Sequence, residues 1–254
     1  MLNYRRAGRG RKVVILQHGF LGGSGYWTLQ MAHLEPLFDL IAPDLPGFAG
    51  SAHLAAPDGI EGLAGVLLQL LDHLGVERFA LVGHSMGGMV AGQLALDHPD
   101  RVERLVLYGT AAAGQLRGRF ETFEESIRRL EQDGIPATAE RIAATWFVHG
   151  RASPLYGLCV DAGRGASLQA ALACLRAIPH WDIRARLGEI DMPTLVIGGD
   201  RDRSIAPSQL MQLWEGIKDA QLCIAPGCAH NVHLEKPDLF NRVLGDFLLA
   251  GGLE

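Results

Sequence analysis

The sequence predicts an α/β fold with a mostly parallel central sheet and helices on both of its faces. Short apolar runs rich in β-branched residues alternate with segments of helical spacing. The runs are continuously apolar, which is typical of parallel strands that are buried on both faces. The chain has 254 residues, of which 48% are hydrophobic, so it is long enough and apolar enough to form one such domain.

The first half of the chain follows this alternation closely. Only about 11 residues precede the first apolar run, so any earlier strand must be short. Gly75 is expected to stop one long helix, because glycine accepts the backbone conformation that follows a helix end. The expected elements are strands at 12–19, 38–47, 78–83 and 104–109, and helices at 60–74 and 86–97.

The second half resumes the pattern only near its end. Strands are expected at 193–200 and 220–227, each followed by a helix. The stretch 114–181 between the halves contains helical patches and no clear strand. We therefore expect a core made of residues 1–113 and 182–254, with residues 114–181 inserted as a helical lid or cap.

The stretch GHSMGGM (83–89) stands between an apolar strand and a helical segment. A serine hydroxyl must stand clear of the sheet to meet a base and a substrate, and a tight strand-to-helix turn exposes it. Side chains at Gly83 and Gly87 are expected to collide across such a turn. The sequence therefore predicts Ser85 as a nucleophile, with helix N–H groups available to a developing oxyanion.

A nucleophilic serine needs a base and a group that orients the base. Asp200 and Asp202 follow one late strand, and His230 and His233 follow the next. The order serine, aspartate, histidine is the order expected for this architecture. Spacing alone leaves both pairs of candidates open.

The chain resembles the α/β-hydrolase superfamily over nearly its whole length. The stretches that carry the resemblance are HGFLGG, APDLPGFAGS, GHSMGG, GGDRDRSIAP and GCAHNVHLEKP. In the superfamily's base motif the histidine is followed by a glutamate and a proline, and His230 fits this pattern where His233 does not. The superfamily's acid precedes a proline by four or five residues, which favours Asp202, in a loop one residue longer than common.

The resemblance implies a role for each residue. Ser85 attacks a carbonyl carbon, His230 takes its proton, and Asp202 orients the imidazole. The backbone N–H groups of Phe20 and Met86 would hold the oxyanion. Two aromatic residues of the insertion, Trp146 and Phe147, are expected to bind substrate. Five of the insertion's arginines are candidates to bind a substrate carboxylate: Arg117, Arg119, Arg151, Arg164 and Arg176.

The resemblance favours a serine hydrolase that cleaves a small carboxylic ester or an enol-lactone through an acyl-enzyme. Residues 139–147 and 173–199 are similar to parts of 3-oxoadipate enol-lactonases and related carboxylesterases. A C–C bond hydrolase or a lyase acting on a small keto acid is the alternative. Ring-cleavage C–C hydrolases usually have Asn before the serine and Trp after the base, whereas this chain has His84 and Asn231. A non-enzymatic ligand-binding protein is the remote alternative.

Composition limits the partners. The net charge is −5 and there is no basic run, so no nucleic acid is expected. No apolar run approaches the roughly 20 residues that span a bilayer, so no membrane is expected. The four cysteines have no metal-ligand spacing and are expected to be reduced thiols of a cytoplasmic protein. We expect a monomer or homodimer without metal or cofactor.

Overall fold

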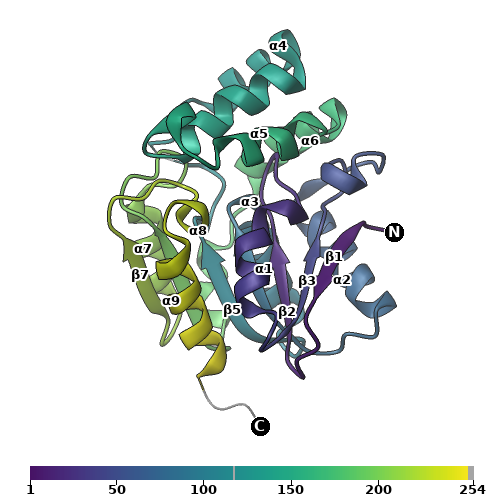
Figure 1. Ribbon diagram of the computed structural model, residues 1–254, viewed down its shortest axis with the longest axis vertical. Coiled ribbons are helices and arrows are strands. Elements are labelled where there is room, and N and C mark those ends of the chain that lie inside the picture. The colour runs from purple at the N-terminus through teal and green to yellow at the C-terminus, as the bar shows by residue number, and fades with distance from the viewer. Residues whose placement is uncertain (117, 251–254) are drawn as a thin grey trace.

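A seven-stranded sheet forms the centre of the protein, in the order β1-β3-β2-β4-β5-β6-β7 (Figure 1). The computed structural model describes residues 1–116 and 118–250, and the counts here refer to those residues. β1 pairs antiparallel with β3, and all other neighbours are parallel. The strands are β1 (Tyr4–Ala7), β2 (Val13–Gln17), β3 (Asp39–Pro43), β4 (Phe79–His84), β5 (Val102–Tyr108), β6 (Thr194–Gly199) and β7 (Gln221–Ala225).

The middle of the sheet is buried on both faces. Every residue of β3, β4 and β6 is buried, as expected for parallel strands covered by helices. The predicted mostly parallel sheet is confirmed, and the strand expected to be short before it is the four-residue β1. Its antiparallel pairing with β3 keeps the N-terminal segment at the sheet edge.

Helices cover both faces of the sheet. α1 packs against α9, and α2 packs against α3. In Figure 1 α1 and α9 lie on the near face of the sheet, and α2 and α3 lie on the far face. The helices of the core are α1 (Thr28–Leu34), α2 (Gly59–His73), α3 (Met86–Asp97), α7 (Pro207–Gly216), α8 (Val232–Glu235) and α9 (Pro237–Leu249). Among the described residues, no helix is both long enough and apolar enough to cross a membrane.

The described residues of 114–181, called the helical insertion below, stand at the carboxyl ends of the parallel strands (Figure 1). Its helices are α4 (Phe123–Ala143), α5 (Tyr156–Arg164) and α6 (Leu168–Ala177), and α4 packs against both others. α4 is kinked at Gly134, where φ is 74°. A backbone bridge between Ala113 and Asp182 joins the two ends of the insertion.

Candidate active site

Ser85 occupies a strained turn between β4 and α3. Its φ is 58° and its ψ is −122°, a conformation that residues other than glycine rarely adopt. Hydrogen bonds to the Ser85 backbone hold this conformation: the Ser85 N–H donates to the Tyr108 carbonyl at 2.9 Å, and the Thr110 hydroxyl donates to the Ser85 carbonyl at 2.7 Å. Such strain costs on the order of 1–3 kcal/mol and persists where the surrounding structure enforces it.

Glycines allow this turn by letting backbone segments approach closely. A Cβ atom at Gly83 would clash with the carbonyl oxygen of Gly87 and with the Cβ of Ala91, so the turn needs glycine there. A Cβ atom at Gly87 would clash instead with the carbonyl of His18, in the loop after β2. The collision expected across the turn is thus found for Gly83, whereas Gly87 makes room for a neighbouring loop.

Asp202 and His230 meet at the ends of β6 and β7. Asp202 Oδ2 lies 2.7 Å from His230 Nδ1, and both side chains are 1% exposed. The other carboxylate oxygen of Asp202 accepts hydrogen bonds from the N–H groups of Ser204 (2.7 Å) and Ile205 (3.0 Å). Asp200 is exposed and accepts from the Cys228 N–H at 3.2 Å. The structure therefore brings Asp202, and not Asp200, to His230.

The main chain of His230 is fixed by two buried side chains. The Tyr108 hydroxyl lies 3.0 Å from the His230 carbonyl oxygen, and His84 Nε2 lies 3.2 Å from the same oxygen. His233 contacts Tyr108 instead of Asp202, with its Nδ1 2.8 Å from the Tyr108 hydroxyl. Burial lowers the pKa of His233 to about 3 and the pKa of His84 well below its usual range, so both rings are neutral at pH 7.

The loop after β2 packs directly against the Ser85 turn. A Cβ atom at Gly19 would lie 2.8 Å from the Ser85 Cβ and 3.3 Å from the Met86 nitrogen, so the backbone leading to Phe20 touches the turn. Met86 is the first residue of α3, where N–H groups have no acceptor within the helix. His18 holds this loop: its Nδ1 lies 2.8 Å from the Gly19 carbonyl oxygen.

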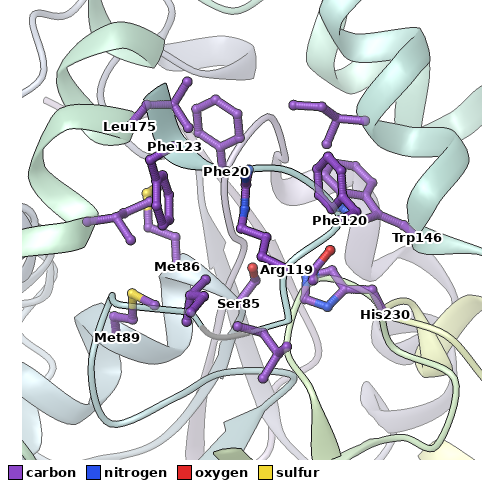
Figure 2. A pocket seen from close by; sticks show the side chains of 15 residues that line it. Phe20, Ser85, Met86, Met89, Arg119, Phe120, Phe123, Trp146, Leu175 and His230 are labelled. Atoms are coloured by element: carbon purple, nitrogen blue, oxygen red, sulfur yellow. The ribbon is translucent and has the colours of Figure 1, made fainter. Parts of the chain in front are cut away.

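A small cavity of about 50 Å³ lies in front of Ser85 (Figure 2). Trp146 lines it, whereas Phe147 is buried and is not among the lining residues. The lining residues are mostly apolar, with two serines, one histidine and one arginine among them: Phe20, Ser85, Met86, Met89, Leu116, Arg119, Phe120, Phe123, Ile142, Trp146, Leu175, Ile178, Ser204, Ile205 and His230.

The five arginines considered above lie in different surroundings. Arg119 lines the cavity, and Arg117 lies outside the described residues. Arg164 forms an ion pair with Glu140, Arg176 forms one with Glu131, and Arg151 is exposed.

The cavity also holds Met89, Phe120, Phe123 and Ser204, which were not predicted from the sequence. Ser204 follows Asp202 by two positions, and this proximity to the expected acid is a signal that could have identified it. Phe120 and Phe123 flank the start of α4, and no motif distinguishes them from other aromatic residues of the insertion.

Comparison with known proteins identifies the family of the chain. Residues 12–237 match the family model of the alpha/beta hydrolase fold. The chain is 31% identical to a 2-hydroxy-6-oxo-6-phenylhexa-2,4-dienoate hydrolase of Comamonas testosteroni, over 98% of this chain and 91% of that protein. It is also 31% identical to a putative carbamate hydrolase, RutD, of Agrobacterium fabrum, over 93% and 92% of the two chains.

A solved structure extends the similarity to three dimensions. The enol-lactonase of Burkholderia xenovorans LB400 superposes with a TM-score of 0.88 at 28% identity, over 97% of this chain and 96% of that chain. The predicted resemblance is therefore confirmed, and the relatives named here are hydrolases and a lactonase. This chain belongs to the alpha/beta hydrolase fold family and is an enzyme of the hydrolase class.

Proposed function

We propose that this hydrolase cleaves a small carboxylic ester or lactone through an acyl-enzyme on Ser85. The observation that carries the proposal is the 2.7 Å contact between Asp202 and His230 beside the cavity that Ser85 also lines. A serine on a strained turn, a buried histidine and a buried carboxylate are the groups that acyl transfer requires.

In the proposed mechanism, His230 acts first as a base and then as an acid. Neutral His230 carries its proton on Nδ1, held by Asp202, so that Nε2 is free to accept the Ser85 proton. Ser85 Oγ attacks the carbonyl carbon, and the imidazolium protonates the leaving alcohol. Water then attacks the acyl-enzyme by the same route, with His230 again taking and returning a proton.

The N–H groups of Phe20 and Met86 are the proposed donors to the oxyanion. The close approach of Gly19 to Ser85 and to the Met86 nitrogen supports this role, because it brings the two backbone segments next to each other. Each such donor typically stabilises the transition state by about 3–4 kcal/mol. The side chains of both residues line the cavity, where they would contact the substrate.

The helical insertion is proposed to act as a lid that selects the substrate. It contributes Arg119, Phe120, Phe123 and Trp146 to the cavity, whereas Ser85, Asp202 and His230 come from loops of the core. Binding groups on a separate segment can vary without moving the reacting groups. The cavity's small volume supports a small substrate over a long acyl chain.

Hydrolysis of a C–C bond in a small keto acid is the second candidate. The similarity to the dienoate hydrolase of Comamonas testosteroni favours it. The compound in that enzyme's name contains a ketone and no ester, so its hydrolysis must break a carbon–carbon bond. The same serine, histidine and aspartate could serve either reaction, and the substrate decides between them.

The proposal is tested with 4-nitrophenyl acetate and a fluorophosphonate probe. We expect turnover by the wild type, labelling at Ser85, and a loss on the order of 10⁴-fold in Ser85→Ala. Ser208→Ala, an exposed serine on α7, is the matched control. Full activity in Ser85→Ala would disprove the serine mechanism. Absence of turnover of both the ester and the conjugated dienoate by the wild type would favour a binding protein. Faster turnover of the conjugated dienoate than of any ester would select the second candidate.

A further inference from the structure

Arg119 is the one residue with a permanent charge among the described residues that line the cavity. It comes from the loop before α4, and Figure 2 shows its side chain extending between Phe123 on one side and Phe120 on the other. The guanidinium carbon lies 4.5 Å from the centroid of each ring. Two rings that flank a guanidinium cover its faces and limit its orientations.

No carboxylate in the described part of the chain forms an ion pair with Arg119. Its Nη1 donates to the Glu121 carbonyl oxygen (2.7 Å) and to the Ser126 hydroxyl (2.8 Å). The Glu121 carboxylate is already occupied by Arg141, whose Nη1 lies 2.7 Å from both oxygens, and by the Ser126 hydroxyl. Burial lowers the pKa of Arg119 to about 10, so the side chain stays charged at pH 7.

A second polar group without a partner lines the same cavity. The Ser204 hydroxyl is buried and has no hydrogen-bond partner among the described residues. The Phe120 N–H donates to the Arg203 carbonyl at 2.9 Å, which holds the segment of Arg119 beside the segment of Ser204. A buried hydroxyl without a partner costs about 1–3 kcal/mol, so a bound group that accepts its proton would be favoured.

We propose that Arg119 and Ser204 form a subsite for a carboxylate, so that the substrate carries a carboxylate in addition to the bond that is cleaved. This inference rests on the proposed ester or lactone hydrolysis. A carboxylate matches one guanidinium in charge and accepts two of its N–H groups in parallel. A phosphate carries more charge and more acceptors than one arginine and one hydroxyl satisfy.

Paired esters of equal size test the subsite. The first pair is 4-nitrophenyl hydrogen glutarate and 4-nitrophenyl 4-carbamoylbutanoate, and the second is 4-acetoxybenzoate and 4-acetoxybenzamide. The acidic ester of the first pair carries its charge on the acyl side, and that of the second pair carries it on the alcohol side. In Arg119→Met, which keeps the stem and removes the charge, we expect kcat/KM for the preferred acidic ester to fall at least about thirtyfold. The neutral ester should change less than about threefold.

Three further variants sharpen the comparison. Arg119→Lys keeps the charge and should restore part of the preference for the acidic ester. Ser204→Ala should lower kcat/KM for that ester alone by about three- to tenfold, the effect of one lost hydrogen bond. Arg151→Met removes an exposed arginine of the insertion and should leave both esters unchanged. If Arg119→Met does not fold, Arg119→Lys and Ser204→Ala are compared on the same acidic and neutral esters.

Binding of glutarate by calorimetry separates failure of this inference from failure of the proposed function. Esterase activity without preference for the acidic esters, together with glutarate binding that Arg119→Met does not weaken, would overturn the subsite and leave the proposed function standing. Absence of ester turnover, together with glutarate binding weakened at least about tenfold in Arg119→Met, would overturn the proposed function and leave the subsite. Equal loss on both esters of each pair would show that Arg119 supports only the fold of the insertion.

Discussion

Two aspartates separated by one residue should respond very differently to replacement by asparagine. In Asp202→Asn, the side-chain carbonyl would keep accepting from the N–H groups of Ser204 and Ile205, because these donors cannot be satisfied by an amide NH₂. The NH₂ group would then face His230 Nδ1 at the position of Oδ2, 2.7 Å away. The histidine would accept at Nδ1 and carry its proton on Nε2, where it cannot take one from Ser85.

The expected size of the effect follows from this inverted tautomer. Loss of the carboxylate and inversion of the tautomer together lower kcat by about 10⁴-fold in serine hydrolases, which corresponds to about 5.4 kcal/mol. Asp200→Asn should reduce kcat less than about fivefold. Its carbonyl can still accept from the Cys228 N–H, and its contact with Arg201 spans 3.6 Å between exposed side chains, which is worth about 0–1 kcal/mol.

Initial rates with 4-nitrophenyl acetate measure both variants, and far-UV circular dichroism with thermal melting checks that each is folded. A loss of activity in Asp200→Asn as large as that in Asp202→Asn would contradict the assignment of His230's partner. Retention of more than about a tenth of the activity in Asp202→Asn would contradict the tautomer argument itself.

Two other predictions follow from burial. The His233 pKa is about 3 when folded and about 6.5 when unfolded, so the unfolded chain binds the extra proton and stability falls as the pH drops below about 6.5. His233→Gln should therefore flatten the dependence of the unfolding free energy on pH between pH 6 and 4, by up to about 1.4 kcal/mol per pH unit. Urea denaturation measures this slope, with His33→Gln, at an exposed histidine, as the control. An unchanged slope in His233→Gln would refute the reasoning. Trp146→Ala should widen the cavity and shift the preference among esters toward longer acyl chains. Phe147 is buried outside the cavity, so Phe147→Ala should lower the free energy of unfolding by about 3–5 kcal/mol without shifting this preference. The reverse pattern would contradict the placement of these two side chains.

Apolar periodicity was enough to predict the sheet, because parallel strands buried on both faces are apolar throughout. The predicted strand at 78–83 and helix at 86–97 match β4 (Phe79–His84) and α3 (Met86–Asp97) closely, and they frame the Ser85 turn. α1 was not predicted. It has only seven residues and follows directly from a short 3₁₀ turn, so it lacks a capping side chain that would mark its start.

The cavity was harder to predict than the groups that meet beside it. The contact between Asp202 and His230 follows from strand order, since the carboxyl ends of neighbouring parallel strands share one edge of the sheet. Which aromatic residue lines the cavity depends on how the insertion folds back over that edge. Phe147 follows Trp146 in the chain, yet only Trp146 lines the cavity, and no local pattern distinguishes the two.

Not every change in the helical insertion would leave the proposed catalytic groups in place. Main-chain hydrogen bonds join it to both loops that carry the acid and the base. The Phe120 N–H donates to the carbonyl of Arg203, next to the proposed acid, and the Asn231 N–H donates to the carbonyl of Trp146 at 3.1 Å.

Glu235 strengthens the second of these connections. Its Oε1 accepts from the Val148 N–H of the insertion at 2.8 Å, and its Oε2 accepts from the Ala229 N–H next to His230 at 2.6 Å. One carboxylate therefore ties the insertion to the base loop. Side chains that only line the cavity can vary independently of the chemistry, but backbone movements at 120 or 146–148 must move the loops of Asp202 and His230. Under the proposed function, substrate selection and catalysis would therefore be separable at the level of side chains and coupled at the level of the main chain.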